Sequence, residues 1–370
     1  MKKSLFIILV YCLLLLFISS CTEHQGSGKT TKIRTMVDTV GFAHLDRQMD
    51  SVLNRIERDY GIFLNNLKDS LEIKSQTSWK IAISPHDDYA YASYVYPAVL
   101  DNVKTKTVIL FGVAHKARLF DLEDVLVFDN FDNWQCPYGP VQVSSWREEI
   151  LEQLPDDLYT VHDSMHAVEH SLEALLPFLQ ARQRDLEIVP ILIPYMSFEK
   201  MLEIAVPLSG AILETANKHN AAWGVDYSFL ISTDCVHYGD EDWGGKNYAP
   251  YGTDTAGYNL AVGHELEIID SCLICQIDPY KLRKFTSYTV SEEDHKIYKW
   301  PWCGRYSVPF GLLTAYYLGE FQGFDVPCGL RICYATSIDH PVLSVADLRM
   351  GTTAPSNLHH WVGYVAIGYE

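Results

Sequence analysis

Three histidines occupy equivalent places in the sequence. His86, His115 and His237 each follow a short, apolar, β-branched run within a few residues. Such runs are typical of buried strands, so each strand would release a histidine close to its end. Imidazoles gathered from separate strand ends form either an acid–base cluster or a metal site, and neutral histidine is the commonest metal ligand. We therefore expect these three side chains to meet in one site.

Carboxylates accompany two of these histidines. Asp87 and Asp88 directly follow His86, and Asp234 shortly precedes His237. Carboxylates commonly orient metal-bound imidazoles through the second ring nitrogen, and we predict this role for all three aspartates. Asp234 is also a candidate proton acceptor.

Cys303 is the fourth candidate ligand. It shortly precedes residues 312–321, which we predict to be a helix whose N-terminal dipole would favour a thiolate. On its own, a buried and inert cysteine would be the simpler interpretation. Beside three imidazoles, however, its sulfur would complete a donor set that suits copper, iron or zinc better than magnesium or calcium.

A further polar cluster contains Glu169 and His170. His166 and His170 are four residues apart, as are Glu169 and Glu173, so on a helix each pair would share a face. His170 and Glu169 are therefore candidates for acid–base chemistry. The same residues, with Ser171, would also serve as an ordinary helix cap, and the sequence leaves both interpretations open.

The elements that must position these residues alternate between strands and helices, which predicts a single α/β domain over residues 39–370. We expect a mostly parallel, mixed sheet with helices on both faces, and in such sheets ligands bind beyond the carboxyl ends of the strands. The predicted strands are 80–84, 107–112, 125–128, 188–193, 229–233, 331–334 and 362–369. The predicted helices are 41–66, 145–154, 171–184, 198–219, 255–275, 279–285 and 312–321.

Composition supports a folded chain and excludes one class of partner. The 370 residues are 48% hydrophobic, enough for a substantial core, and carry a formal net charge of −18. A surplus of negative charge repels phosphate backbones. Nucleic acid is therefore not an expected partner.

The N-terminal residues resemble a bacterial lipoprotein signal. Two lysines precede an apolar run that is too short for a comfortable membrane span, and small residues lead to Cys21. We predict a signal peptide at 1–20, lipidation of Cys21 and a flexible tether over 21–38. The protein would then be anchored by lipid in the bacterial cell envelope, and Thr22 favours the outer membrane. An uncleaved anchor, or an ordinary signal peptide with an incidental cysteine, is the alternative.

Five blocks, in this order, resemble the Memo family, also called the AmmeMemoRadiSam system protein B family. Its fold is similar to that of the class III, LigB-type extradiol dioxygenases. The family blocks are P-H-A-G-Y, L-G-P-S-H, E-H-S-I-E, S-S-D-F-x-H-W/Y-G and C-G-R/K. The matching blocks here are P-H-D-D-Y (85–89), F-G-V-A-H (111–115), E-H-S-L-E (169–173), S-T-D-C-V-H-Y-G (232–239) and C-G-R (303–305).

The resemblance implies a metal site of His86, His115, His237 and Cys303, the same quartet that the strand ends indicate. It also implies copper or iron and redox chemistry. Two departures stand out. Asp87-Asp88 replaces A-G, which would favour a harder ion or tune ligand orientation, and Lys116 stands where a second histidine often follows.

Three functions are compatible with these residues. The first is a metal-dependent redox or oxygenase-like enzyme that uses copper or iron on an unidentified small substrate, with His170 or Asp234 as the proton acceptor. The second is a non-catalytic metal-binding lipoprotein. The third is a zinc-dependent hydrolase; a deacetylase motif at 86–88 would lack its proline and leave the other blocks unexplained.

Overall fold

The computed structural model describes residues 31–324 and 327–370. Within it, Lys32–Glu370 forms one folded unit. The predicted signal peptide, Cys21 and the first part of the predicted tether lie outside the described residues. Among the helices that are described, none is both long and apolar enough to cross a membrane.

A parallel block forms the centre of a 13-stranded sheet, in the order β8-β3-β9-β2. Antiparallel strands continue the sheet beyond β2 in the order β13-β12-β11, and β6, β5 and β1 continue it beyond β8. Three short strands branch off: β10 pairs with β13, and β4 pairs with β7 and β8. The bounds are β1 (Ile33–Arg34), β2 (Ile81–Ser84), β3 (Thr107–Val113), β4 (Leu126–Phe128), β5 (Asn133–Trp134), β6 (Val141–Val143), β7 (Tyr159–Val161), β8 (Glu187–Ile193), β9 (Tyr227–Ser232), β10 (His237–Gly239), β11 (Cys275–Gln276), β12 (Cys328–Thr336) and β13 (His360–Tyr369).

The central strands are apolar on both faces because helices cover both faces. Along β3, Ile109 and Phe111 enter one hydrophobic core, whereas Val108 and Leu110 enter the other. This alternation follows from the two-residue period of a strand. A strand buried on both faces therefore reads as a continuous apolar run, as buried parallel strands do.

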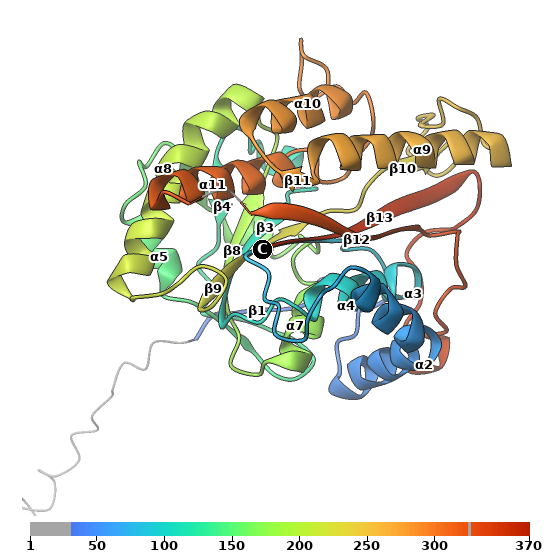
Figure 1. The fold of residues 1–370 in the computed structure, drawn as a ribbon, viewed down its shortest axis with the longest axis horizontal. Helices are drawn as coiled ribbons and strands as arrows, with labels where there is room; N and C mark the ends of the chain where they lie inside the picture. The colour runs from blue at the N-terminus through green and yellow to red at the C-terminus, as the bar shows by residue number, and fades with distance from the viewer. Residues whose placement is uncertain (1–30, 325–326) are drawn as a thin grey trace, which may run out of the picture. The chain divides into compact units, whose positions relative to one another are not determined.

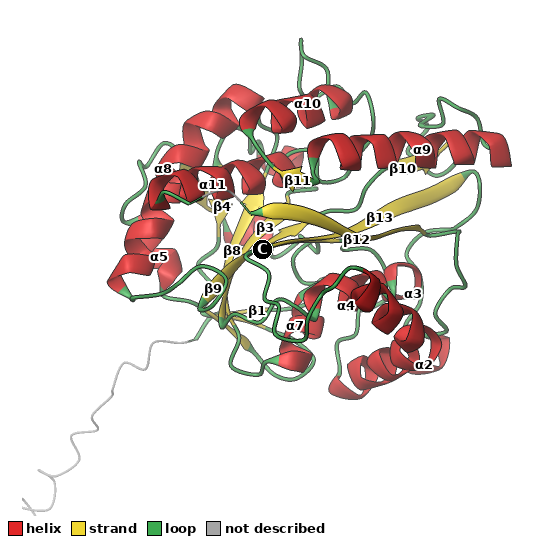
Figure 2. Ribbon diagram, viewed as in Figure 1, coloured by secondary structure: helices red, strands yellow, loops and turns green. Residues whose placement is uncertain are grey.

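Helices form one layer on each face of the sheet (Figures 1 and 2). Helices α5, α8, α9, α10 and α11 pack on the core that contains Phe111, and α2, α3, α4 and α7 pack on the other. The bounds are α2 (Asp46–Ser70), α3 (Tyr89–Ala92), α4 (Val95–Leu100), α5 (Trp146–Leu151), α6 (Asp163–His166), α7 (Leu176–Arg182), α8 (Phe198–Lys218), α9 (Thr255–Cys272), α10 (Pro279–Thr289) and α11 (Ser307–Gln322).

The structure confirms the predicted α/β fold class and shifts several helix limits, of which two lie next to the candidate site. The helix expected over 171–184 begins only at Leu176, because the backbone N–H of Ser171 donates to the Glu169 carboxylate and the chain continues as a turn. The helix expected over 312–321 begins earlier, at Ser307. Its first turn therefore lies close to Cys303 in sequence.

The folded domain also begins earlier than residue 39, within the expected tether. Ile33–Arg34 pairs in parallel with β5, and Arg34 is 1% exposed. The Arg34 guanidinium lies 2.6 Å from Glu173 Oε2 and donates to the carbonyl oxygens of His166 and Glu169. A short polar segment has no periodicity that reveals such a strand, because its stability comes from these distant partners.

Arg34 offers a direct test of this N-terminal contact. Arg34→Met would leave the Glu173 carboxylate buried without its cation, and we expect a loss of about 3–5 kcal/mol in the free energy of unfolding. Urea denaturation of the full chain measures it. The control is Arg58→Met, since Arg58 forms an exposed pair with Asp59 that contributes little. Equal unfolding midpoints for the two variants would contradict a structural role for β1.

Candidate metal centre

The ends of three adjacent strands bring the predicted histidines together. His86 follows β2, His115 follows β3 and His237 begins β10, shortly after β9. The Nε2 atoms of His86 and His115 lie 3.3 and 3.1 Å from the sulfur of Cys303. These three ligand atoms lie within 4.8 Å of one another. The strands β3, β9 and β2 are neighbours in the sheet, so their carboxyl ends converge here.

The second ring nitrogens of His86 and His115 are already engaged. His86 Nδ1 lies 2.8 Å from Ser232 Oγ, and His115 Nδ1 lies 2.8 Å from Glu169 Oε1. When each ring is neutral, a proton on Nδ1 leaves the Nε2 lone pair on the side of the sulfur. Oriented imidazoles of this kind are typical of metal sites.

His237 is placed beside Cys303 by a short antiparallel pairing. The N–H of His237 donates to the Pro301 carbonyl at 3.1 Å, and the N–H of Cys303 donates to the Cys235 carbonyl at 3.0 Å. His237 Nε2 is buried and has no hydrogen-bond partner among the described residues. It belongs to a second group, with Asp234 and Cys303, whose ligand atoms also lie within 4.8 Å of one another.

Glu169 holds one side of the centre. Its carboxylate is buried and accepts the backbone N–H groups of His115, His170 and Ser171 as well as the His115 ring. Burial alone would raise the pKa of Glu169, but His115 and the hydrogen bonds lower it. Likewise, burial would lower the pKa of His115, but Glu169 and then Cys303 raise it well above the usual value.

His170 lies on the partly exposed side of the centre. Its ring stacks on His115 with centroids 4.8 Å apart and lies 5.8 Å from the His86 ring. Burial and the neighbouring His115 lower the pKa of His170 to about 4, so the ring is neutral at pH 7. The expected pairing with His166 does not occur, because α6 ends at His166 and that ring contacts the Val127 carbonyl instead.

Asp234 lies against the first histidine. Its Oδ1 accepts the His86 N–H at 2.9 Å, and its Oδ2 lies 3.4 Å from His86 Nε2. Burial raises the pKa of Asp234 to about 7. At neutral pH this carboxyl therefore exchanges readily between its protonated and ionised forms.

Asp87 and Asp88 do not orient the ring nitrogens. Asp87 accepts the hydroxyl of Tyr364 at 2.5 Å, and Asp88 accepts the backbone N–H and hydroxyl of Thr353. Ser232 and Glu169 bind the Nδ1 atoms in their place. Burial raises the pKa of both aspartates to about 7.

Glu265 is a supporting residue that sequence reasoning missed. This fully buried carboxylate on α9 accepts the N–H of Val236 at 3.0 Å and the indole N–H of Trp300. It thus joins the segment that carries His237 to the segment that carries Cys303. A glutamate at a buried position of a largely apolar helix was the available signal.

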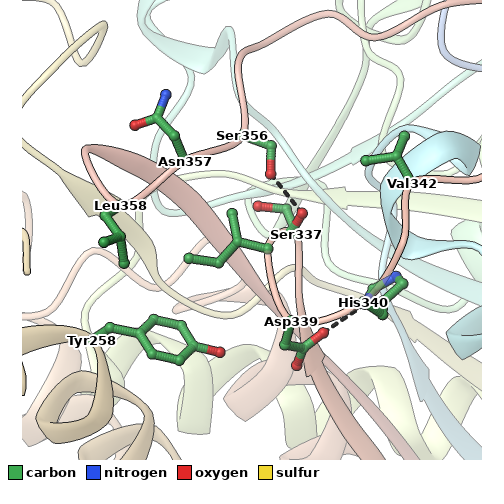
Figure 3. A pocket seen from close by; sticks show the side chains of 9 residues that line it. Tyr258, Ser337, Asp339, His340, Val342, Ser356, Asn357 and Leu358 are labelled. Carbon is green, nitrogen blue, oxygen red and sulfur yellow. Dashed lines mark hydrogen bonds and ion pairs between the residues drawn. The ribbon is translucent and has the colours of Figure 1, made fainter. Parts of the chain in front are cut away.

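A separate surface pocket of about 470 Å³ shares no lining residue with the centre (Figure 3). It contains an Asp339–His340 pair. His340 Nδ1 contacts Asp339, and Nε2 lies 2.7 Å from the Tyr91 carbonyl. Both ring nitrogens of His340 are therefore engaged in polar contacts.

The donor set of the centre fits a transition metal. Imidazole and thiol are the ligands that copper, iron and zinc prefer, and both imidazoles next to the sulfur are oriented by a second partner. The buried, unpartnered His237 Nε2 adds a third nitrogen. These residues therefore form a candidate metal-binding cluster, with the identity of the ion open between these elements.

Comparison with known proteins gives one consistent result. The model of the Memo family, described as Memo-like protein, matches residues 51–339. The chain is 31% identical over 162 residues to a MEMO1 family protein of Methanosarcina barkeri, which covers 42% of this chain and 54% of that relative. It is 29% identical over 181 residues to a MEMO1 family protein of Aquifex aeolicus, covering 47% and 61%.

The chain thus spans between half and two thirds of the length of these curated relatives. The family match, by contrast, covers most of this chain and includes all five blocks. The resemblance seen in the sequence is confirmed, and the chain belongs to the Memo family.

Proposed function

We propose that this Memo-family chain binds a transition metal, copper or iron in preference to zinc, through His86, His115, His237 and Cys303. The observation that supports this most directly is the approach of two imidazole Nε2 atoms to one sulfur at 3.1 and 3.3 Å, with both Nδ1 atoms engaged elsewhere. The proposed activity is redox or oxygenase-like chemistry on a small molecule.

A bound copper or iron ion would supply one-electron redox chemistry at this place. The chain itself supplies proton transfer. His170 is neutral at pH 7 and stacks on a ligand ring, so it is the proposed proton acceptor. Asp234 is the second candidate, and Glu169 holds the His115 ring in its orientation.

Elemental analysis tests the ligand assignment. We expect near-stoichiometric copper or iron in the full chain, purified without chelators or a histidine tag, and a loss of most of it in His86→Ala and Cys303→Ala. His219→Ala is the matched control, because this exposed histidine pairs with Glu149 and belongs to none of the candidate ligand groups. Full metal content in His86→Ala would contradict the assignment, and bound zinc would favour a hydrolase.

Metal affinity should rise with pH between 6 and 8. In the metal-free protein, Glu169 raises the pKa of His115 well above its usual value despite burial, so a metal ion must displace a proton from this ring. One displaced proton changes the apparent affinity about tenfold per pH unit. Competition with a chelator measures the slope.

Glu169→Gln is the informative variant for this slope. It removes the negative charge that raises the His115 pKa, so the affinity should depend less on pH than in the parent protein. An affinity that stays constant between pH 6 and 8 in the parent protein would rule out a displaced His115 proton.

We propose further that the chain is a lipoprotein of the bacterial cell envelope, anchored to the membrane through Cys21. The support is the sequence alone: a basic start, an apolar run and small residues before the cysteine. A membrane location would expose the centre to substrates of the envelope.

Radiolabelled palmitate tests the anchor. We expect the label to enter the protein in a lipoprotein-processing host and to be absent from Cys21→Ala. Label that persists in Cys21→Ala, or that never enters the parent protein, would show that Cys21 is not lipidated.

A further inference from the structure

Some histidines of the proposed metal centre reach solvent. His86 and Cys303 are buried, whereas the His115 and His170 side chains are 28% and 36% exposed. His237 is also partly exposed, so a small molecule can approach the centre past these rings. Groups beside these rings decide which molecules can bind.

Two basic side chains act electrostatically on histidines of this centre: Lys116 on His170 and Arg305 on His237. Lys116 directly follows His115, and Arg305 follows Cys303 by two residues. Neither forms an ion pair with any described residue. This contrasts with Arg34, Arg147 and Lys296, which each pair with a carboxylate. In a chain of net charge −18, unpaired cations beside a site point to a ligand of opposite charge.

Arg305 is held in a fixed position. Its Nη1 donates to the Trp302 carbonyl at 2.6 Å, and its guanidinium carbon lies 3.5 Å from the centre of the Tyr298 ring. Trp302 pairs with Val236, the residue before His237, so this contact keeps Arg305 beside two proposed ligands. The Arg305 Nε atom is shielded from solvent and has no hydrogen-bond partner among the described residues.

An orphan donor of this kind is costly unless a ligand accepts it. The planar guanidinium binds carboxylate and phosphate groups particularly well, since its parallel N–H groups match their oxygens. Stacking on Tyr298 fixes the guanidinium plane in advance, so little side-chain entropy would be lost on binding.

Further cations surround the same aromatic residues. Arg118 lies 4.8 Å from the Tyr195 ring centre, and Lys246 lies 6.0 Å from that of Tyr298. The Tyr195 and Tyr298 hydroxyl groups act on each other electrostatically. The positive charge therefore extends over a surface rather than a single residue.

Nearby carboxylates are largely engaged. Asp38, which acts on His170 electrostatically, accepts the N–H groups of Val40 and Gly41. Glu123, which shares a cavity of about 300 Å³ with Arg118, pairs with Lys296. Asp121 also lines that cavity. None of these acids forms an ion pair with Arg305.

We propose that the substrate of this centre is a small organic anion, and that Arg305 binds its carboxylate or phosphate group while Lys116 and Arg118 add to the attraction. Arg305 is thus a substrate-binding residue that sets the charge of the accepted molecule. This inference rests on the proposed metal centre for its chemistry, but not for the binding itself.

Calorimetric titration of the full chain with benzoate and phenyl phosphate, against benzamide as a neutral analogue, tests this proposal. We expect at least one anion to bind about tenfold more tightly than benzamide, and Arg305→Gln to remove this preference, as loss of a charge-assisted hydrogen bond should. Arg305→Lys should retain part of it, since it keeps the charge without the planar fork.

Arg47→Gln is the matched control, because it removes the same charge from an exposed residue of α2 and should leave the anion preference intact. The proposal is overturned if benzamide binds as tightly as both anions, if neither anion binds, or if Arg305→Gln behaves like Arg47→Gln.

Metal content, measured on the same samples, separates the two proposals. The metal-free protein is titrated in parallel, since a carboxylate also coordinates a metal directly. An Arg305-dependent anion preference in a protein that acquires no metal would support the anion site and refute the metal centre. Bound metal without any anion preference would do the reverse.

Discussion

The buried carboxylate of Glu169 is the constraint on which the candidate centre depends. It accepts three backbone N–H groups and the ring of His115, so it fixes the loop after β3 and the turn before α7 at the same time. A buried charge is stable only with such partners. The carbonyl of the same residue accepts Arg34 from the N-terminal strand, so β1 also supports this turn.

Strand order explains why sequence reasoning located the histidines. Buried parallel strands are recognisable as apolar runs, and their carboxyl ends meet on one edge whatever their exact order. His86, His115 and the segment of His237 therefore had to converge once the strands were identified. No periodicity in the sequence reveals the antiparallel contact between Cys235 and Cys303. Cys303 could therefore be predicted as a ligand only from the chemistry of its thiol and from the family resemblance.

The residues that support the ligands were harder to predict, because a residue next to a ligand in the sequence need not point its side chain toward that ligand. Asp87 and Asp88 adjoin His86 but bind Tyr364 and Thr353. Ser232, at the end of the adjacent strand β9, reaches the His86 ring instead. Cross-strand register controls this contact, since Ser84 and Ser232 are paired residues of β2 and β9. Register depends on the whole sheet and cannot be read from one segment.

The ionisable groups around the histidines are of two kinds. Shielding from solvent raises the pKa of the Asp87, Asp234 and Glu265 carboxyl groups to about 7. Lys116 and Arg305, which form no ion pair with a described residue, act electrostatically on His170 and His237 instead. Buried carboxyls of this pKa store protons near neutral pH at low cost in charge, whereas cations in contact with water attract ligands from solution. The proposed function uses both kinds of group: the buried carboxyls for proton exchange and the cations for selection of an anion.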